Sequence, residues 1–241
     1  MDISHGRALS LAIVLVLSVS AAPAADADGW VQLFNGKDLS GWKIHPMPNP
    51  AIQDITEKKD ADGKIIAFEG TVKKEKVALW RVEDGTIIGG GPASHLFSDR
   101  GDYVNFHFRV EAKVNDKGNS GQYFRTAFGP GFPKGYEAQL NATHGDPVKT
   151  GSIYPDSRVG LDKFRAKITV LDTAPHKADE FFTQEVIAIG AKITILVNGK
   201  KTIEWKDPDH RFKKGHFALQ AHDPGSIMTF RKIEVKELKA E

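Results

Sequence analysis

Two short runs with strand-like alternation carry the side chains best suited to chemistry, and a loop rich in Gly and Pro separates them. The runs cover residues 121–125 and 136–140. A strand sends successive side chains to opposite faces, so Glu137 and Gln139 share one face while their neighbours form an apolar face toward the core. By the same rule, three residues in or just before the first run point away from the core: Asn119, Tyr123 and Arg125.

If the two runs lie near each other in one sheet, a carboxylate, an amide, a guanidinium and a phenol gather on one exposed face. Glu137 is the leading candidate for acid–base work, because its environment can tune it as a proton acceptor or donor. Arg125 could bind an oxyanion or an enolate bidentately, or could only neutralise Glu137. Gln139 could hydrogen-bond a sugar hydroxyl. In the simplest alternative, Glu137 is a solvent-facing strand residue in a cross-strand pair.

A second polar cluster alternates with apolar residues late in the chain, over residues 215–223. His216, Gln220 and His222 fall on one face and could serve acid–base work or ligate a metal. On a strand the two histidines lie roughly 20 Å apart, so they cannot hold one ion together. A metal would need other ligands such as His144 or Asp146. The sequence therefore requires no cofactor, although a divalent metal is possible and its ligands remain unknown.

The rest of the chain indicates an all-β scaffold for these residues. The clearest strand covers residues 106–114, in which apolar and polar residues alternate. No segment after residue 24 shows a helical period of apolar residues over three turns. Many short strands and frequent turns predict a sandwich of two antiparallel sheets. The dipeptides that predict type I′ hairpins are Asn35-Gly36, Asp62-Gly63, Asp84-Gly85 and Asn198-Gly199. Further strands are expected over residues 165–171, 185–189, 215–221 and 228–235.

Two less regular segments interrupt the strand pattern. Residues 47–76 are highly charged and are expected to form a solvated excursion with one hairpin at Asp62-Gly63. Residues 141–163 are rich in Gly, Asp and Ser and are expected to loop over the face that carries Glu137. Neither segment has the composition of a linker, so one domain over residues 25–241 is predicted.

The first 24 residues have the pattern of a signal peptide. Arg7 precedes an apolar run, and residues 22–24 form a small-residue cleavage site. The apolar run is too short to anchor the chain in a bilayer, and a buried N-terminal helix is the alternative. We therefore expect a soluble periplasmic or secreted protein. The chain has no cysteine, so its core must stabilise it without disulfides, and its net charge of +2 carries no basic stripe for nucleic acid.

Several common catalytic patterns are absent from the sequence. There is no G-x-S-x-G elbow, no cysteine nucleophile, no P-loop and no Gly-rich dinucleotide fingerprint. A glycosidase with two carboxylates needs them roughly 5 to 10 Å apart, and the run around Glu137 offers no second acid on the same face.

A series of motifs, matching in order and spacing from about residue 30 to residue 238, resembles the 3-keto-disaccharide hydrolase domain family. The motifs are WVQLFNGKDLSGW at residues 30–42, NSG at 119–121, FR at 124–125, GYEAQ at 135–139, TGSIY at 150–154, VNGK at 197–200, LQAH at 219–222 and FRKI at 230–233. Two positions depart from the family pattern: residues 179–182 lack a Trp, and Ala221 stands where a more polar residue is usual.

The resemblance implies a concanavalin-like jelly roll whose concave sheet holds a sugar site. Members of the family act on glycosides whose C3 hydroxyl has been oxidised to a ketone by a separate dehydrogenase, and they are common among exported bacterial proteins. A C3 ketone acidifies the C2 proton, so one base suffices: proton removal is followed by loss of the C1 oxygen, and water adds afterwards.

Under this resemblance the candidate residues take definite roles. Glu137 shuttles the proton, while Arg125 and His222 stabilise the enolate oxygen by charge-assisted hydrogen bonds. The residues expected to hold ring hydroxyls are Asn119, Tyr123, Gln139, Tyr154 and Gln220. Two alternatives stay open: a glycan-binding module without catalysis on the same fold, and a retaining endoglucanase.

Overall fold

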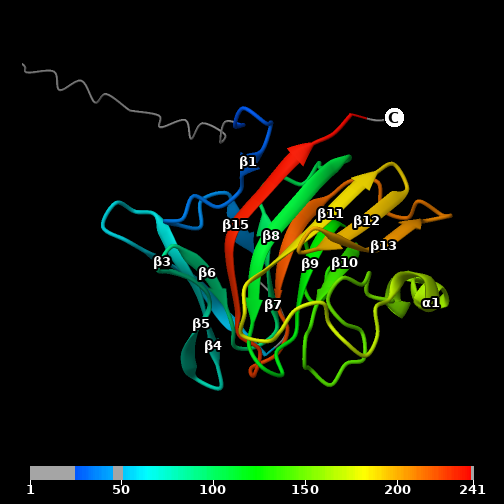
Figure 1. Cartoon of the computed structure of the whole chain (residues 1–241). Helices are drawn as coiled ribbons and strands as arrows, with labels where there is room; N and C mark the ends of the chain where they lie inside the picture. Colours follow the sequence, from blue (N-terminus) through cyan, green and yellow to red (C-terminus); the bar gives the residue numbers. More distant parts are fainter. Residues whose placement is uncertain (1–24, 46–50, 240–241) are drawn as a thin grey trace, which may run out of the picture.

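The computed structural model describes residues 25–45 and 51–239, and within them two antiparallel sheets form an all-β sandwich (Figure 1). The all-β prediction is confirmed, whereas the expected signal peptide lies outside the described residues. The ten-stranded sheet has the order β13 (Lys200–Lys206), β12 (Lys192–Val197), β11 (Phe182–Ile189), β8 (Phe106–Val114), β15 (Met228–Glu237), β6 (Thr86–Gly89), β5 (Glu75–Glu83), β4 (Ile65–Val72) and β3 (Gln53–Lys59), and β1 (Val31–Gln32) pairs with β15. The five-stranded sheet has the order β10 (Tyr136–Leu140), β9 (Ser120–Thr126), β14 (His216–Ala221), β7 (Ser94–Ser98) and β2 (Trp42–Ile44).

The core lies between the two sheets, and alternation along the strands builds it. In β8 the apolar residues are buried and the polar residues between them are half-buried, as the sequence predicts. Phe108 of β8 stacks on Phe217 of β14 with ring centroids 3.9 Å apart, so the large sheet and the small sheet contact each other directly.

Three of the four predicted hairpins are confirmed. Asp84-Gly85 and Asn198-Gly199 have positive φ at both residues, as type I′ turns require, and they join β5 to β6 and β12 to β13. Asp62-Gly63 lies in the connection between the paired strands β3 and β4, but only Gly63 of the two has positive φ, so this hairpin does not have the predicted type I′ turn. The prediction at Asn35-Gly36 is wrong, because β1 and β2 belong to different sheets. There the Asn35 side chain accepts the backbone N–H groups of Lys37 and Asp38.

The predicted strand over residues 165–171 is also wrong. The segment begins with a short helix, α1 (Arg165–Ile168), after two 3-10 turns, η1 (Ser157–Val159) and η2 (Asp162–Phe164). A helix of one turn is too short to show a helical period, so the alternation of apolar residues misled the prediction. Ile168 is buried, and its carbonyl accepts the N–H of Ile153. The helix therefore fastens the connecting segment to the sandwich.

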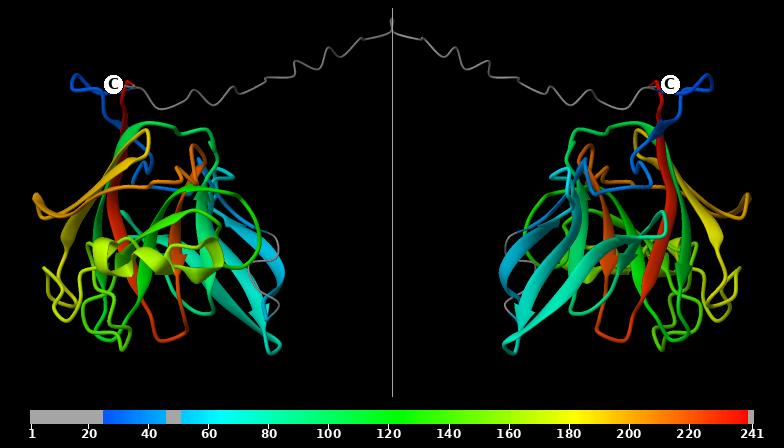
Figure 2. Two further views of the ribbon diagram at one scale, coloured as in Figure 1. Left: turned by 90° about the vertical axis from the view of Figure 1, so that its right-hand side faces the viewer. Right: turned by 90° about the vertical axis from the view of Figure 1, so that its left-hand side faces the viewer.

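The segment that follows β10 folds back along the same strand. The N–H of Tyr154 donates to the carbonyl of Glu137, and the N–H of Gln139 donates to the carbonyl of Ser152. In the left-hand view of Figure 2 the helical turns around α1 lie in front of the strands. Together with the cavity walls described below, these contacts confirm that residues 141–163 loop over the face that carries Glu137.

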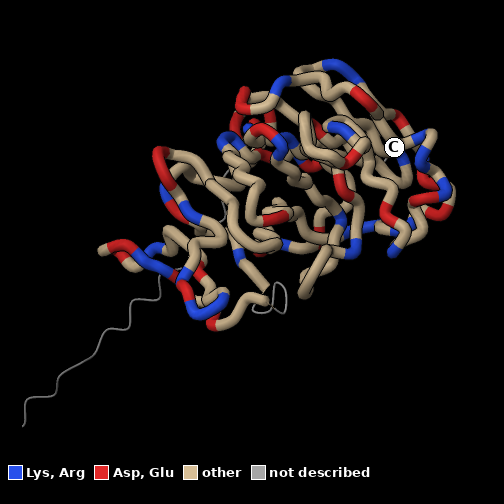
Figure 3. Tube along the Cα trace, turned by 90° about the horizontal axis from the view of Figure 1, so that it is seen from below, with Lys and Arg blue, Asp and Glu red and all other residues tan. Residues whose placement is uncertain are grey.

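The surface of the described part carries charge of both signs. Figure 3 shows Lys and Arg interspersed with Asp and Glu along the trace, without a continuous stripe of one sign in that view. Within residues 25–45 and 51–239, no helix has the length and apolar character needed to span a bilayer.

Candidate active site

A cavity of about 400 Å³ lies over the polar face of the five-stranded sheet. Its floor comes from β10, β14 and the residue before β9, and its walls come from residues 154–165 and from Phe132 in the β9–β10 loop. The structure therefore brings together most of the predicted site residues. Those that line the cavity are Asn119, Glu137, Gln139, Tyr154, Gln220 and His222.

Glu137 is buried in the cavity floor, with only 7% of its surface exposed, so it is not a solvent-facing strand residue. It lies opposite Tyr123 in the β9–β10 ladder, and the Tyr123 hydroxyl donates to its Oε2 at 2.6 Å. Burial raises the pKa of Glu137 to about 8, while the hydrogen bond from Tyr123 opposes the rise and the carboxylate of Asp156 adds to it. Glu137 can therefore gain or lose a proton near neutral pH.

Gly121 makes room for the Glu137 carboxylate. The two residues lie on neighbouring strands, and a methyl group at Gly121 would collide with Oε1 and Cδ of Glu137. Glycine is thus required at position 121 of the NSG motif because the Glu137 side chain approaches the backbone closely there, and not because of a turn.

A hydrogen-bonded chain fixes the amide of Gln220 behind Glu137. Because the Tyr123 hydroxyl donates its proton to Glu137, it must accept from Gln220 Nε2, which lies 3.1 Å away. The same Nε2 lies 3.4 Å from Nε2 of His95. Burial, together with the charges of Arg158 and His222, lowers the pKa of His95 to about 3, so His95 is a neutral acceptor. Oε1 of Gln220 remains buried without a protein partner.

Gln139 is fixed in a similar way on the other side of Glu137. Its Nε2 donates to Asn119 Oδ1 at 3.1 Å, and Asn119 Nδ2 lies 3.3 Å from His144 Nδ1. Oε1 of Gln139 is also buried without a protein partner. Two amide oxygens in the cavity lining are therefore left to accept hydrogen bonds from the hydroxyl groups of a ligand.

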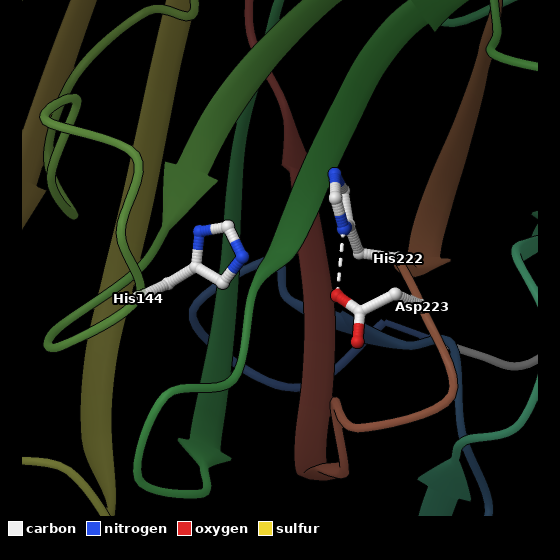
Figure 4. Close-up of side chains that lie close together, drawn as sticks. All are labelled: His144, His222 and Asp223. Atoms are coloured by element: carbon white, nitrogen blue, oxygen red, sulfur yellow. Dashed lines mark hydrogen bonds and ion pairs between the residues drawn. The ribbon is translucent and has the colours of Figure 1, made fainter.

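His222 and Asp223 form a dyad at the edge of the cavity (Figure 4). Nδ1 of His222 lies 2.8 Å from Oδ2 of Asp223, and the carboxylate also accepts from Ser226 Oγ and from the N–H of Gly225. Burial works against ionisation, but these hydrogen bonds outweigh it and lower the pKa of Asp223. An ionised Asp223 holds the Nδ1 proton and leaves Nε2 of His222 for a ligand.

His144 joins this dyad to form a group with the donor set of a metal site. The ligand atoms of His144, His222 and Asp223 all lie within 4.8 Å of one another (Figure 4). However, the N–H of Asp146 donates to His144 Nδ1, which places the His144 proton on Nε2. A bound ion would have to replace that arrangement. His216 lies elsewhere, bonded to the carbonyl of Ser98, and Asp146 instead accepts from the Tyr154 hydroxyl.

Arg125 does not face the cavity, so its predicted role at the enolate is wrong. Its φ of 49° is left-handed, and the register between β9 and β14 shifts at this point, which breaks the alternation that the sequence implied. The guanidinium is buried and donates to the carbonyls of Val104, Gly190 and Phe212. Arg125 therefore ties three connecting segments together.

The cavity wall instead carries two arginines that sequence reasoning missed, Arg158 and Arg165. Arg158 is bonded to both carboxylate oxygens of Asp156, and its guanidinium lies 4.7 Å from the ring centroid of Phe132. Arg158 lies in the short 3-10 turn η1 and Phe132 in the β9–β10 loop, and neither segment has a periodicity that could have singled them out. The only sequence signal was the expectation that residues 141–163 cover the face of Glu137.

Comparison with known proteins relates the chain to carbohydrate-active enzymes. The model of a family described as the 3-keto-alpha-glucoside-1,2-lyase-like domain matches residues 29–236. A protein of Bacteroides thetaiotaomicron named 3-keto-disaccharide hydrolase is 26% identical over 164 residues, which are 62% of this chain and 47% of that protein. The chain thus matches about half the length of that relative.

Solved structures confirm the fold. A protein from Parabacteroides distasonis ATCC 8503, assigned provisionally to the glycosyl hydrolases, superimposes with a TM-score of 0.63 at 21% identity, covering 88% of this chain and 95% of the other. A non-specific endo-beta-1,3(4)-glucanase of family GH16 superimposes with a TM-score of 0.52 at 14% identity, covering 90% of this chain and 94% of the other. At these identities the likeness establishes the jelly-roll sandwich alone.

Proposed function

The chain belongs to the family of 3-keto-alpha-glucoside-1,2-lyase-like domains, and on this premise we propose that it cleaves 3-keto-glycosides by elimination followed by hydration. The observation that carries the proposal is Glu137, a single buried carboxyl group with a pKa of about 8 in the floor of a polar cavity. A base poised near the working pH is what removal of a C2 proton next to a ketone requires.

In the proposed reaction Glu137 takes the C2 proton, and the electron pair of that bond moves toward the C3 ketone to form an enolate. When the electrons return, the C1–O bond breaks and a C1–C2 double bond forms. Glu137 hands its proton to the departing oxygen, which leaves as the aglycone alcohol. Addition of water across the double bond then gives the free 3-keto sugar.

The remaining cavity residues have supporting roles in this proposal. His222, when protonated and paired with Asp223, stabilises the enolate oxygen, and Arg158 adds positive charge to the wall in place of Arg125. Tyr123 acts through its hydrogen bond to Glu137. The residues proposed to hold ring hydroxyls are Asn119, Gln139, Tyr154 and Gln220.

The substrate and the pattern of residues 1–24 set the proposed context. A 3-keto-glycoside must be made by a separate dehydrogenase that oxidises the C3 hydroxyl, so such an enzyme is the proposed upstream partner. The signal-peptide pattern supports a periplasmic or extracellular site for the proposed reaction.

Turnover of a 3-keto-disaccharide by the purified protein tests the proposal. We expect cleavage of the oxidised substrate and none of the unoxidised disaccharide. Glu137→Gln should abolish turnover without unfolding the protein, because it removes the base and retains the shape. Glu111→Gln is the matched control: Glu111 lies in the ten-stranded sheet, paired with Arg231, and its loss should leave turnover unchanged. Full activity in Glu137→Gln would remove the assignment.

A glycan-binding module is the second candidate, because the two unpaired amide oxygens of Gln139 and Gln220 could recognise hydroxyl groups without catalysis. Saturable binding of the oxidised disaccharide with no released product would favour it. Cleavage of unoxidised laminarin or cellulose would instead favour an endoglucanase, for which acids in the cavity wall such as Asp156 would have to supply the second carboxylate.

The cluster of His144, His222 and Asp223 could hold a divalent ion, which would polarise the ketone of the substrate when bound. Turnover measured before and after treatment with a chelator shows whether His222 acts as a metal ligand or as the partner of Asp223 without a metal. Loss of turnover that a divalent ion restores, together with loss of ion binding in His144→Ala, would assign a metal to the cluster. Unchanged turnover would support the dyad acting alone.

A further inference from the structure

Phe132 stands at the rim of the cavity with 40% of its surface exposed. We propose that its ring is the platform for the aglycone, so that the rim forms a second subsite for 3-keto-glycosides with a cyclic aglycone that presents an apolar face. The inference rests on the proposed function, which it deepens by naming the class of leaving group.

The two ends of the cavity differ in chemistry. The floor presents Glu137 and the buried amide oxygens of Gln139 and Gln220, which suit a sugar ring that carries only hydroxyl and ketone oxygens. The side chain that the β9–β10 loop contributes at the rim is an aromatic ring. Once the oxidised sugar lies with its C2 proton at Glu137, the group bonded to C1 must extend from the floor toward the opening. Phe132 therefore meets the aglycone and not the sugar that reacts.

The Phe132 ring is held in position although it is partly exposed. The guanidinium of Arg158 packs against it, and Asp156 fixes that guanidinium through both carboxylate oxygens. On the inner side the ring approaches His95 edge-on, with centroids 5.6 Å apart, and lies 6.1 Å from the ring of His222. A ring already fixed by its neighbours loses little freedom when a ligand stacks on it.

The same loop provides a matched control in Phe128. Its exposed fraction is 38%, close to that of Phe132, but it packs on Phe97 with centroids 5.1 Å apart and does not line the cavity. A change in the loop as a whole should affect both positions, whereas a platform for the aglycone depends on Phe132 alone.

The test compares three substrates that share the oxidised sugar: phenyl 3-keto-glucoside, a 3-keto-disaccharide and methyl 3-keto-glucoside. Phe132→Ala should lower kcat/KM for the two cyclic aglycones by about three- to tenfold, mainly through KM, because a stacked ring contributes binding of that size. Turnover of the methyl glycoside should not change. Phe132→Tyr should restore the wild-type preference, and Phe128→Ala should leave all three substrates unaffected.

Equal losses on the methyl and phenyl glycosides, or the same effect from Phe128→Ala, would overturn the platform. Loss with the phenyl glycoside alone would restrict it to aryl aglycones, and loss with the disaccharide alone would restrict it to sugars. If the wild-type protein turns over none of the three, the proposed function fails. Calorimetry would then still test the subsite, by comparing the affinities of the phenyl and methyl glycosides for the wild type and for Phe132→Ala. If each protein binds the two glycosides equally well, the subsite is excluded.

Discussion

Glu137 has an unusual proton affinity because the sheet places its carboxyl group in the floor of a cavity, where little of it is exposed to water. A buried carboxylate without a full counter-charge holds its proton more tightly, and here the pKa rises to about 8 although Tyr123 donates a hydrogen bond. The positive charge of Arg158 lowers the pKa of Glu137, but the carboxylate of Asp156, which binds Arg158, raises the pKa of Glu137. The residue is therefore poised between acid and base.

This proton affinity predicts the pH dependence of turnover. A base acts only when it is deprotonated, so kcat/KM should rise with pH as Glu137 ionises, with the ascending limb of the profile near pH 8. Values of kcat/KM for a 3-keto-disaccharide, measured between pH 5.5 and 9.5 and corrected for any loss of folded protein, would show this rise. A rate that falls across the same range would mean that Glu137 acts as an acid in the free enzyme.

Stability should report the same pKa without any substrate. Between the unfolded pKa near 4.5 and the folded pKa of about 8, the folded state holds a proton that the unfolded state releases, so wild-type stability decreases as pH rises through this window. Glu137→Gln cannot ionise and escapes this loss. In urea denaturation we expect the free energy of unfolding of the variant to exceed that of the wild type by on the order of 4 kcal/mol at pH 8 and to match it near pH 4.5. Equal pH dependence of the two proteins would contradict the raised pKa.

Gly121 offers a second test at the residue scale. Gly121→Ala places a methyl group where the Glu137 carboxylate lies, so the carboxylate must move and the hydrogen bond from Tyr123 must lengthen. We expect a loss of at least tenfold in kcat with a 3-keto-disaccharide. The pH at which kcat/KM rises should also move higher, because the hydrogen bond from Tyr123 favours the ionised form of Glu137 and lowers its pKa. Gly129→Ala is the control, because no atom lies near a methyl group at that position. Unchanged kcat in Gly121→Ala would show that the carboxylate position is not critical.

At the scale of elements, the active site depends on connections between strands more than on the strands themselves. Residues 152–154 follow β10 by hydrogen bonds, and the cation–π contact between Arg158 and Phe132 joins the two loops that border the cavity. At the other end of β9, Arg125 binds the carbonyls of three connecting segments. The connecting segments are thus held by hydrogen bonds and side-chain contacts outside the ladders between the named strands.

Arg125 should therefore prove structural. Arg125→Met leaves the carbonyls of Val104, Gly190 and Phe212 without this donor, and we expect a loss of about 3 kcal/mol in the free energy of unfolding. The folded fraction should keep its kcat/KM within about twofold, because the guanidinium is not in the cavity. Arg81→Met serves as the control, since the Arg81 pair with Glu83 is exposed. A collapse of kcat with unchanged stability would return Arg125 to the catalytic site.

At the scale of the whole molecule, the two sheets share one core. The largest cluster of buried apolar residues includes Trp80 and Phe108 of the ten-stranded sheet with Trp42 and Phe217 of the five-stranded sheet. Neither sheet can lose its partner without exposing apolar surface, and the absence of cysteine means that no disulfide supports either one.

Unfolding should therefore be a single cooperative transition. Tryptophan fluorescence and far-ultraviolet circular dichroism should give the same midpoint in urea, because the two signals report on one core. Addition of a reductant should not shift the midpoint. Two separate midpoints would show that the outer hairpins of β3, β4 and β5 unfold apart from the sandwich.

Local chemistry in the sequence was enough to determine the sheet class and much of the cavity floor. Alternation identified β8, the Asp-Gly and Asn-Gly turns identified three hairpins, and the spacing of Glu137 and Gln139 placed both on one face. These features depend on neighbours in the chain, so a single sequence contains the information that predicts them.

Only the tertiary structure decided which other groups meet Glu137. A left-handed residue and a register shift turned Arg125 away, and the alternating segment after residue 164 became a helical turn. His95 from β7, with Phe132 and Arg158 from two loops, completed the surroundings of the cavity. Their positions follow from contacts between residues far apart in the sequence, and backbone geometry in bulges and loops has no period from which they could be predicted.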